Sequence, residues 1–419
     1  MMPVSEFLFY WWRCWEPDAV MAVQAVAGLE FRSPNRLVVA AGLALLVVGL
    51  VALAVQFGAR QAALFGLGVA LGLVLYHALF GFASSWRALV SDGRGAGLRA
   101  QMAMLALASL LFLPALDAGS LFGRPVIGAI APVGISVLVG AFLFGIGMQF
   151  GGGCASGTLY TVGGGNTKML ATLVGFLAGS VLGTLHLSWW LGLPSLGVVS
   201  LREAFNLPGA LGVQLAVLAA IVLASLRIER RRHGVLIHGP APLEGEPGWR
   251  RLLQGPWPLI AGGLLLALLN FAVLAVAGHP WSVSFGYALW GAKLAQSMGL
   301  DVASWEFWTW RYPAKALAGS LFAEDTSLTN FGILLGAFLA AGLAGRFAPQ
   351  WRVPIRAVLV AVLGGILMGY GARLAFGCNI GALFSGIASG SLHGWLWMAA
   401  ALVGTALGVP LGRRALGTQ

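Results

Sequence analysis

The stretch FGIGMQFGGGCASGTLY, residues 144–160, ends an apolar run at three glycines that are followed at once by Cys154. Each glycine costs a helix interior about 1 kcal/mol relative to alanine, so a continuous helix through all three is unfavourable. We therefore predict that the helix breaks at Gly151, Gly152 and Gly153 and restarts as a short helix near Cys154. Broken backbone at membrane depth is tolerated only where it is buried in protein or lines a polar cavity. The break is thus expected in the interior of the molecule.

The composition around this stretch is that of an integral membrane protein. The chain has 419 residues, of which 59% are hydrophobic and 9% charged, and its mean hydropathy is +0.87, far from the mix of a soluble domain. Apolar runs of the length that spans a bilayer recur at residues 37–56, 62–82, 133–150 and 357–376. We predict an all-α polytopic membrane protein with about nine to twelve transmembrane or re-entrant helices, because a barrel would show alternating strands of about ten residues.

The charged residues indicate how the chain is oriented. The net charge of +11 is carried mostly by arginines that gather in loops, at residues 87–99, 227–232, 250–251 and 413–414. This is the pattern of cytoplasmic loops under the positive-inside rule, and it accounts for the charge without a nucleic-acid partner. Residues 1–35 carry tryptophans and charges where a signal peptide would be apolar, which favours an interfacial segment.

The second half of the sequence repeats the first. The stretch MGYGARLAFGCNIGALF, residues 368–384, aligns with the opening stretch when Cys378 is placed on Cys154. The arginine-bearing loops predict that the spans leading into the two cysteines run in opposite directions, as in transporters built from inverted repeats. The alignment also pairs glycines around the cysteines, among them Gly153 with Gly377 and Gly157 with Gly381.

These patterns divide the chain into five parts. They are an N-terminal interfacial segment (1–35), a first transmembrane repeat (36–227), a basic cytoplasmic linker (228–256), a second transmembrane repeat (257–412) and a C-terminal tail (413–419). The linker is charged, carries prolines and lacks an apolar helical period. Residues 300–330 require a partial or re-entrant crossing for the predicted topology.

The paired cysteines indicate an anion path. A helix start presents unpaired N–H groups and the positive end of its dipole, which suits an anion. A single buried cysteine is usually a packing residue, but recurrence at equivalent positions, each followed three residues later by glycine, favours function. With three cysteines in the chain we expect no disulfide framework, metal site or cofactor. The candidate path residues are Cys154, Cys378, Gly151, Gly152, Gly153, Gly157, Gly377, Gly381 and Asn379.

The ionisable residues agree with an anionic substrate. All 14 carboxylates fall in loops, termini or segment ends, which gives little support to coupling through an intramembrane acid. Basic residues, in contrast, interrupt apolar segments at Lys168, Lys293 and Arg373. We interpret them as anion-attracting groups, with snorkelling to the interface as the alternative.

The two glycine-cysteine motifs resemble those of the YeeE/YedE family of bacterial inner-membrane sulfur transporters, over about residues 60 to 412. The resemblance implies pseudo-twofold halves whose short hemi-helices meet at a narrow central constriction, where thiols pass thiosulfate along by S–H···S hydrogen bonds. Cys154 and Cys378 match two motif cysteines. Where the family pattern has a third, this chain reads FGFASSWRALVSDG at residues 80–93, with Ser84 or Ser85 at that place. The resemblance also implies a small cytosolic sulfur-carrier partner.

We therefore predict a membrane transporter or channel-like permease for an inorganic sulfur anion, with thiosulfate as the first choice, and no enzymatic activity. Three alternatives remain at this stage. One is an intramembrane sulfurtransferase that holds sulfur as a cysteine persulfide. Another is a carrier of a different sulfur or selenium oxyanion. The third is a structural or partner-binding membrane subunit, which the basic linker would suit.

Overall fold

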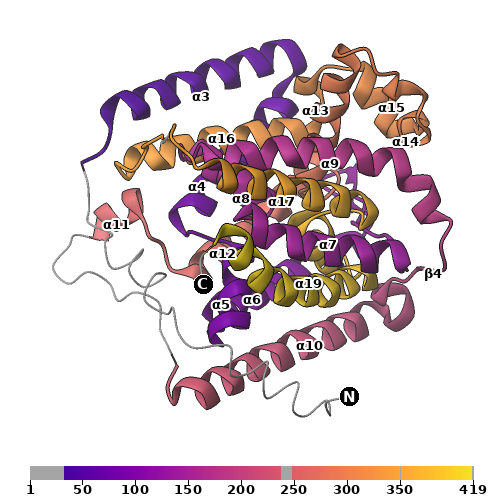
Figure 1. The fold of residues 1–419 in the computed structure, drawn as a ribbon. Helices are drawn as coiled ribbons and strands as arrows, with labels where there is room; N and C mark the ends of the chain where they lie inside the picture. The colour runs from indigo at the N-terminus through magenta and orange to yellow at the C-terminus, as the bar shows by residue number, and fades with distance from the viewer. Residues whose placement is uncertain (1–32, 237–247, 350, 418–419) are drawn as a thin grey trace.

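The computed structural model describes residues 33–236, 248–349 and 351–417. The predicted interfacial segment at residues 1–35 lies almost wholly outside this part of the chain, as does Cys14. Most described residues belong to helices, and the long helices lie side by side with their axes in a common direction (Figure 1).

Ten helical stretches of the described residues are long and apolar enough to cross a membrane, which confirms the predicted all-α polytopic class. The helices of the first half are α3 (Arg36–Phe57), α4 (Ala59–His77), α5 (Phe82–Asp92), α6 (Ala96–Asp117), α7 (Ile135–Gly151), α8 (Ala155–Gly163), α9 (Lys168–Leu191) and α10 (Leu201–His233). Those that follow are α11 (Gly248–Gln254), α12 (Leu259–Ala277), α13 (Ser284–Ser297), η1 (Val302–Ser304), α14 (Glu306–Thr309), α15 (Arg311–Ala318), η2 (Leu321–Ala323), α16 (Asp325–Leu343), α17 (Ile355–Leu374), η3 (Asn379–Phe384), α18 (Ser385–Ala388) and α19 (Leu392–Leu416).

The strands among the described residues form two short antiparallel pairs. β1 (Ser120–Leu121) pairs with β2 (Arg124–Pro125), and β3 (Pro132–Gly134) pairs with β4 (Ser195–Val198). β4 lies at one end of the helices (Figure 1). The strands thus connect helix ends and do not build a sheet across the molecule.

The two helices that lead into the cysteines pack against each other in opposite directions. A Cβ added at Gly140 of α7 would lie 2.6 Å from the carbonyl oxygen of Gly371 on α17, and one at Gly147 would lie 2.7 Å from that of Gly364. Residue numbers therefore rise along one helix as they fall along the other. Small residues at such crossings let helix backbones approach closely, and here they fix two antiparallel spans at the centre of the fold.

Each of these two helices also packs on one further long helix. α17 lies on α9, where Gly175 meets Val362 and Gly179 meets Ile366, and α7 lies on α19 through Gly404. In both pairs, the helix that leads into one cysteine packs on the long helix that follows the other cysteine. This exchange is expected of two repeated units. The inverted relation of the complete halves stays a prediction.

The helix ends differ from the predicted boundaries in three places. α10 continues to His233, five residues past the predicted start of the linker at residue 228, and α11 forms inside the linker. α19 continues to Leu416, beyond the predicted end of the second repeat. Charged side chains extend these helices into the polar region because arginines are good helix formers once the apolar span ends.

The predicted partial crossing at residues 300–330 stays a prediction. These residues hold η1, α14, α15 and η2, which gather at one end of the molecule (Figure 1). Before α13 begins, the chain folds back along α12, because the backbone amide of Trp281 donates to the side chain of Asn270 at 2.8 Å. Trp308 is buried and donates to Thr184 at 3.1 Å.

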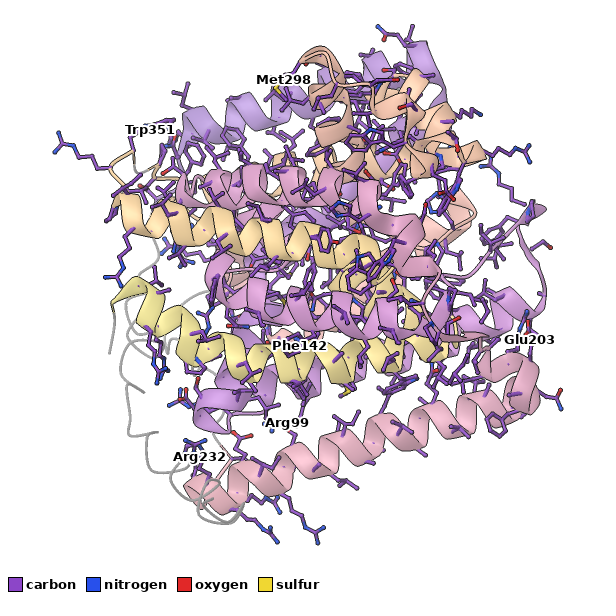
Figure 2. All side chains as sticks on the ribbon, turned by 45° about the vertical axis from the view of Figure 1, so that its right-hand side comes forward. Arg99, Phe142, Glu203, Arg232, Met298 and Trp351 are labelled. Carbon is purple, nitrogen blue, oxygen red and sulfur yellow. The ribbon has the colours of Figure 1, made fainter. Side chains whose placement is uncertain are left out.

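The two ends of the helical bundle differ in charge. Figure 2 shows Arg232 and Trp351 at one end and Glu203 at the other. We call the first the arginine-rich end, and its basic residues include Arg94, Arg232, Arg346 and Arg352. The other, called the opposite end, holds the starts of α4 and α16 and the last turn of α12. The positive-inside rule predicts that the arginine-rich end faces the cytoplasm.

Candidate functional site

The helix break in the opening stretch forms as predicted. α7 ends at Gly151, Gly152 caps it in the left-handed conformation with φ of 82°, and α8 begins at Ala155 with Cys154 as its N-cap. Glycine adopts this φ without the steric penalty that a Cβ adds. Three residues therefore separate the end of α7 from the start of α8, and the last of them, Cys154, places its thiol at the start of the new helix.

The second half repeats this arrangement with different residues. α17 ends at Leu374, Phe376 and Gly377 take φ values of 57° and 156°, and Cys378 becomes the N-cap of η3. η3 is a π-helical turn, a rare form that is frequently found at functional sites. Both cysteines thus stand at the first residue of a short helix that begins inside the molecule.

Both sulfur atoms accept a backbone hydrogen bond. The Gly157 amide donates to Cys154 Sγ at 3.4 Å, and the Ile380 amide donates to Cys378 Sγ at 3.4 Å. Both side chains are buried and neither forms a disulfide. Capping uses sulfur as the acceptor and leaves the S–H hydrogen as a weak donor. Each thiol can therefore donate to a further group at the helix start.

The structure brings the two thiols together in one buried centre. α8 contacts η3, and Cys154 and Cys378 lie close enough to interact electrostatically. Tyr287 of α13 lies near both cysteines, and its hydroxyl donates to the Ala155 carbonyl at 2.9 Å. The amide of Phe82, at the start of α5, also points at Cys154. Starts of α5, α8 and η3 therefore converge on the thiols.

Aromatic rings surround this centre. Phe176 packs against Tyr287 at 4.7 Å between ring centroids, and Phe144 packs against Trp397 at 5.4 Å. The Trp397 indole donates to the Gly377 carbonyl at 3.2 Å, next to Cys378. Our sequence analysis missed these residues. Tyr287 and Trp397 carried a usable signal, because a buried tyrosine or tryptophan usually needs a partner for its polar group.

Two predicted site residues beside Cys378 have polar atoms without partners among the described residues. Asn379 is fully buried, and neither its amide nitrogen nor its amide oxygen is hydrogen-bonded. Arg373 is buried, donates to the Ser284 hydroxyl at 2.9 Å, and has a free Nε. It also interacts electrostatically with Cys378. Buried polar groups are nearly always hydrogen-bonded, so these free donors fit a polar ligand.

The predicted basic residues divide between two places. Lys168 lines a polar cavity of about 590 Å³ at the arginine-rich end, together with Tyr160, Asn166 and Arg346. Tyr160 belongs to α8, so this cavity lies against the helix that begins at the first thiol. Lys293 instead donates to the carbonyls of Leu317 and Gly319 at 2.7 and 2.8 Å, which accounts for its place in the fold without an anion.

Where the resemblance implies a third cysteine, this chain has the hydroxyl groups of Ser84 and Ser85. Ser84 and Ser85 both donate to the Gly81 carbonyl, at 3.1 and 2.7 Å, in the first turn of α5. Their hydrogens are therefore engaged by the helix itself. The position beside Cys154 is filled by the α5 start and offers no third thiol among the described residues.

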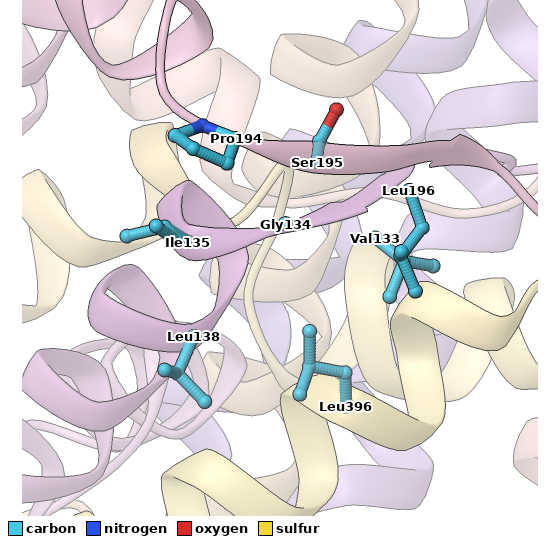
Figure 3. Close-up of a pocket in the computed structure, with 8 residues that line it drawn as sticks. All are labelled: Val133, Gly134, Ile135, Leu138, Pro194, Ser195, Leu196 and Leu396. Atoms are coloured by element: carbon cyan, nitrogen blue, oxygen red, sulfur yellow. The ribbon is translucent and has the colours of Figure 1, made fainter.

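A different pocket lies away from the thiols. It has a volume of about 380 Å³ and is lined by Val133, Leu138, Leu196 and Leu396, with Ser195 as its polar exception (Figure 3). The pocket lies against β3 and β4, where helix ends meet. We assign it no role in the site.

Broken helices that converge on buried polar groups inside a bundle of membrane-spanning helices are typical of one class of protein, polytopic membrane transporters. The comparisons with known proteins agree. The family described as Sulphur transport matches residues 77–407, and the chain belongs to this family, which confirms the resemblance to YeeE/YedE proteins. The description of the family names transport and no enzymatic reaction.

Characterised and annotated relatives extend this result. The chain is 28% identical to the thiosulfate transporter TsuA of Spirochaeta thermophila over 344 residues, 78% of this chain and 92% of the relative. It is 26% identical to the thiosulfate transporter TsuA of Escherichia coli over 64% of this chain and 72% of the relative. It is 31% identical to the probable transporter YedE of Escherichia coli over 155 residues, 36% of this chain. That match spans 37% of the length of the YedE relative.

Proposed function

We propose that this protein carries thiosulfate across the bacterial inner membrane, through a path on which Cys154 and Cys378 are successive contacts. The observation that carries the proposal is the pair of buried thiols, each the N-cap of a helix that starts inside the molecule. The names of the TsuA relatives support the same substrate.

The chemistry of thiosulfate suits the groups around the thiols. Its terminal sulfur is a weak acceptor that an S–H group can reach without holding it tightly, and a conduction site must release its ion. Its oxygens are stronger acceptors, for which the free donors of Asn379 and Arg373 are available. The two kinds of donor lie side by side at Cys378, so a sulfur anion with both kinds of acceptor fits better than sulfate.

The anion meets positive charge at both thiols. Arg373 supplies it beside Cys378, and Lys168 and Arg346 supply it in the cavity against the helix that Cys154 caps. Helix starts contribute a further positive potential, as they do at other anion sites. The glycines at residues 151–153, 157, 377 and 381 keep the backbone of both turns accessible to the anion. We also propose a small sulfur-carrier protein as the partner at the cytoplasmic, arginine-rich end.

Uptake of labelled thiosulfate by cells or proteoliposomes tests the proposal. We expect Cys154→Ala and Cys378→Ala to reduce uptake by at least about tenfold, the effect of one lost contact of about 1.4 kcal/mol in the rate-limiting complex. Cys14→Ala is the matched control and should transport normally. Undiminished uptake by both path variants, at normal expression, would exclude the thiols from the path.

A competition assay addresses the substrate. Unlabelled sulfite, sulfate and selenite should compete less well than unlabelled thiosulfate if the paired thiol and polar donors select the ion. Stronger inhibition by selenite or sulfite would replace thiosulfate by that ion and leave the path unchanged.

A further inference from the structure

A charged cluster ties three segments together at the opposite end. Arg60, at the start of α4, forms two hydrogen bonds to the Asp325 carboxylate at the start of α16, at 2.9 and 2.5 Å. The same guanidinium donates to the carbonyls of Val276 and Ala277, both at 3.1 Å, in the last turn of α12. His279, two residues beyond α12, contacts Asp325 Oδ2 through Nε2 at 3.2 Å.

The hydrogen bonds of His279 require a protonated ring. Its Nδ1 lies 3.1 Å from the Pro280 carbonyl and its Nε2 faces the Asp325 carboxylate, and both partners can only accept. A neutral imidazole has one N–H and can satisfy only one of them. Burial lowers the pKa of His279, but its hydrogen bonds to Asp325 and Pro280 and the charges of Asp325 and Glu324 outweigh burial, so the pKa is raised overall.

The charged and titratable groups around the ring come from every neighbouring segment. Asp325 and Glu324 face it from the start of α16, and Arg60 shares the Asp325 carboxylate from α4. Tyr312 of α15 donates to Glu324 at 2.9 Å. Arg124 of β2 donates to the Val276 carbonyl at 3.3 Å. The ring thus contacts the Asp325 carboxylate, with the charge of Glu324 nearby. Arg60 shares the Asp325 carboxylate with it, and Arg124 is directed at a backbone carbonyl.

The chain that follows His279 leads directly to the second thiol. The Ser385 hydroxyl donates to the Trp281 carbonyl at 2.8 Å, and the Trp281 ring packs against Phe384 at 6.4 Å between centroids. A Cβ added at Gly381 would lie 3.4 Å from the Ser282 hydroxyl. Residues 278–283 therefore rest on the turn that begins at Cys378, and we call them the covering segment.

The covering segment closes the path at this end. The crevice between it and α16, lined by His279, Ser282, Asp325 and Thr329, leaves no room for a water molecule. At the arginine-rich end, in contrast, the cavity beside Lys168 has a volume of about 590 Å³. The chain is thus tightly packed over Cys378 at the opposite end, whereas the larger cavity lies at the arginine-rich end, against the helix that Cys154 caps.

We propose that His279 and Asp325 form a proton-binding site that holds the covering segment closed, and that loss of the proton opens this end of the path to Cys378. The description of the covered route as a path rests on the proposed function. The proton site itself rests on the hydrogen bonds of His279 and on the contacts of residues 278–283.

The arrangement explains why only the covering segment would move. When His279 loses its proton to water, the ring keeps one N–H and must give up either Pro280 or Asp325. Arg60 still holds Asp325 through two hydrogen bonds, so α4 and α16 stay joined. Because the pKa of His279 is raised, closure is complete at acidic pH and is lost as pH rises through that pKa.

Labelling of Cys378 tests the proposal without a transported ion. In a Cys14→Ala, Cys154→Ala background Cys378 is the only thiol, and an impermeant anionic methanethiosulfonate reagent is applied from the side of the opposite end. At pH near 6, we expect His279→Gln to be labelled about tenfold faster than the His279 parent, since one charge-assisted hydrogen bond is lost. His279→Lys, which stays charged, should be labelled as slowly as the parent.

The pH dependence separates the gate from the chemistry of the thiol. Thiol ionisation accelerates labelling in every variant as pH rises from about 6 to about 9, so the rate ratio of His279→Gln to the parent isolates the contribution of His279. This ratio should fall toward one at alkaline pH. His186→Gln, a change at an exposed histidine of α9, is the matched control and should label like the parent at every pH.

The outcomes decide between the two proposals. A ratio that stays constant over the pH range, or equal labelling of the glutamine, lysine and parent proteins, would overturn the proton site even if thiosulfate uptake requires both cysteines. Normal gating in the labelling assay with no thiosulfate uptake would overturn the substrate and leave the proton site standing. Where both hold, uptake rises with pH in the parent and is independent of pH in His279→Gln.

Discussion

The two cysteine turns have the same plan and different chemistry. Each thiol caps a short helix and accepts one backbone amide at 3.4 Å. Five residues before the thiol, however, the first turn has Gln149, whose side-chain oxygen accepts from Arg87 at 2.8 Å, and the second has Arg373. The first turn therefore takes its positive charge from α5, whereas the second carries its own. On the proposed path, the repeated backbone would thus offer the ion a cation from a neighbouring helix at the first turn and a cation of its own at the second.

Removal of the positive charge of Arg373 should have the largest effect on thiosulfate uptake. We expect Arg373→Met to lower thiosulfate uptake by about 100-fold, because a charge-assisted contact to the anion is lost where water cannot replace it. Arg373→Lys should retain part of the activity. Gln149→Met, at the equivalent position of the first turn, should lower uptake much less, because the cation there belongs to another side chain.

Initial rates of uptake at several thiosulfate concentrations provide the measurement. A loss confined to Vmax with KM unchanged in Arg373→Met would argue that the guanidinium organises the turn instead of attracting the ion. Equal losses in Arg373→Met and Gln149→Met would end the distinction between a charged and a neutral turn.

The sequence predicted those parts of the site that depend on local pattern. A run of glycines before Cys154 indicates a broken helix, and Arg373 interrupts an apolar span, so both could be recognised from neighbouring residues. Contacts between distant segments left no such pattern. The Tyr287 hydroxyl meets Ala155 across 132 residues, and Arg60 meets Asp325 across 265. Lys293 is the converse case. Its place in an apolar segment suggested an anion-attracting group, whereas its ammonium group donates to the Leu317 carbonyl on the short helix α15. The sequence pattern did not distinguish this short helix from a membrane crossing.

The two turns should also differ in how strongly a glycine-to-alanine change, which adds one methyl group, destabilises the protein. Gly377 has φ of 156°, and a Cβ there would lie 2.6 Å from the Ala382 amide nitrogen. At the equivalent Gly153 the nearest atom is the Met169 methyl at 2.9 Å, which can move. We expect Gly377→Ala to destabilise the protein by about 2 kcal/mol more than Gly153→Ala, because backbone cannot yield as a side chain does.

Thermal unfolding in detergent, followed by circular dichroism, compares the two alanine variants under the same conditions. Similar unfolding temperatures would show that the second turn is as free to relax as the first. The π-helical form of η3 would then be a tolerant part of the fold.

Asn379 offers the finest distinction, because it separates binding from folding. The equivalent residue of the first turn is Ala155, so the amide is an addition peculiar to the second turn. Its amide atoms have no partner among the described residues, whereas the buried Asn270 accepts from the Trp281 amide at 2.8 Å and donates to Ser385 at 3.3 Å. We expect Asn379→Leu to raise the KM for thiosulfate about tenfold with no loss of stability, since it removes a desolvated polar group that the protein itself does not satisfy.

The control is Asn270→Leu, which should lower the unfolding temperature because it leaves the Trp281 amide without its acceptor. It should also loosen residues 278–283, so its effect on uptake follows from folding and not from contact with the ion. A fall in stability in Asn379→Leu, with KM unchanged, would mean that this amide has a partner within the protein and serves the fold. A rise in KM at full stability would instead make the unpaired amide a contact of the anion, present in one of the two turns and absent from the other.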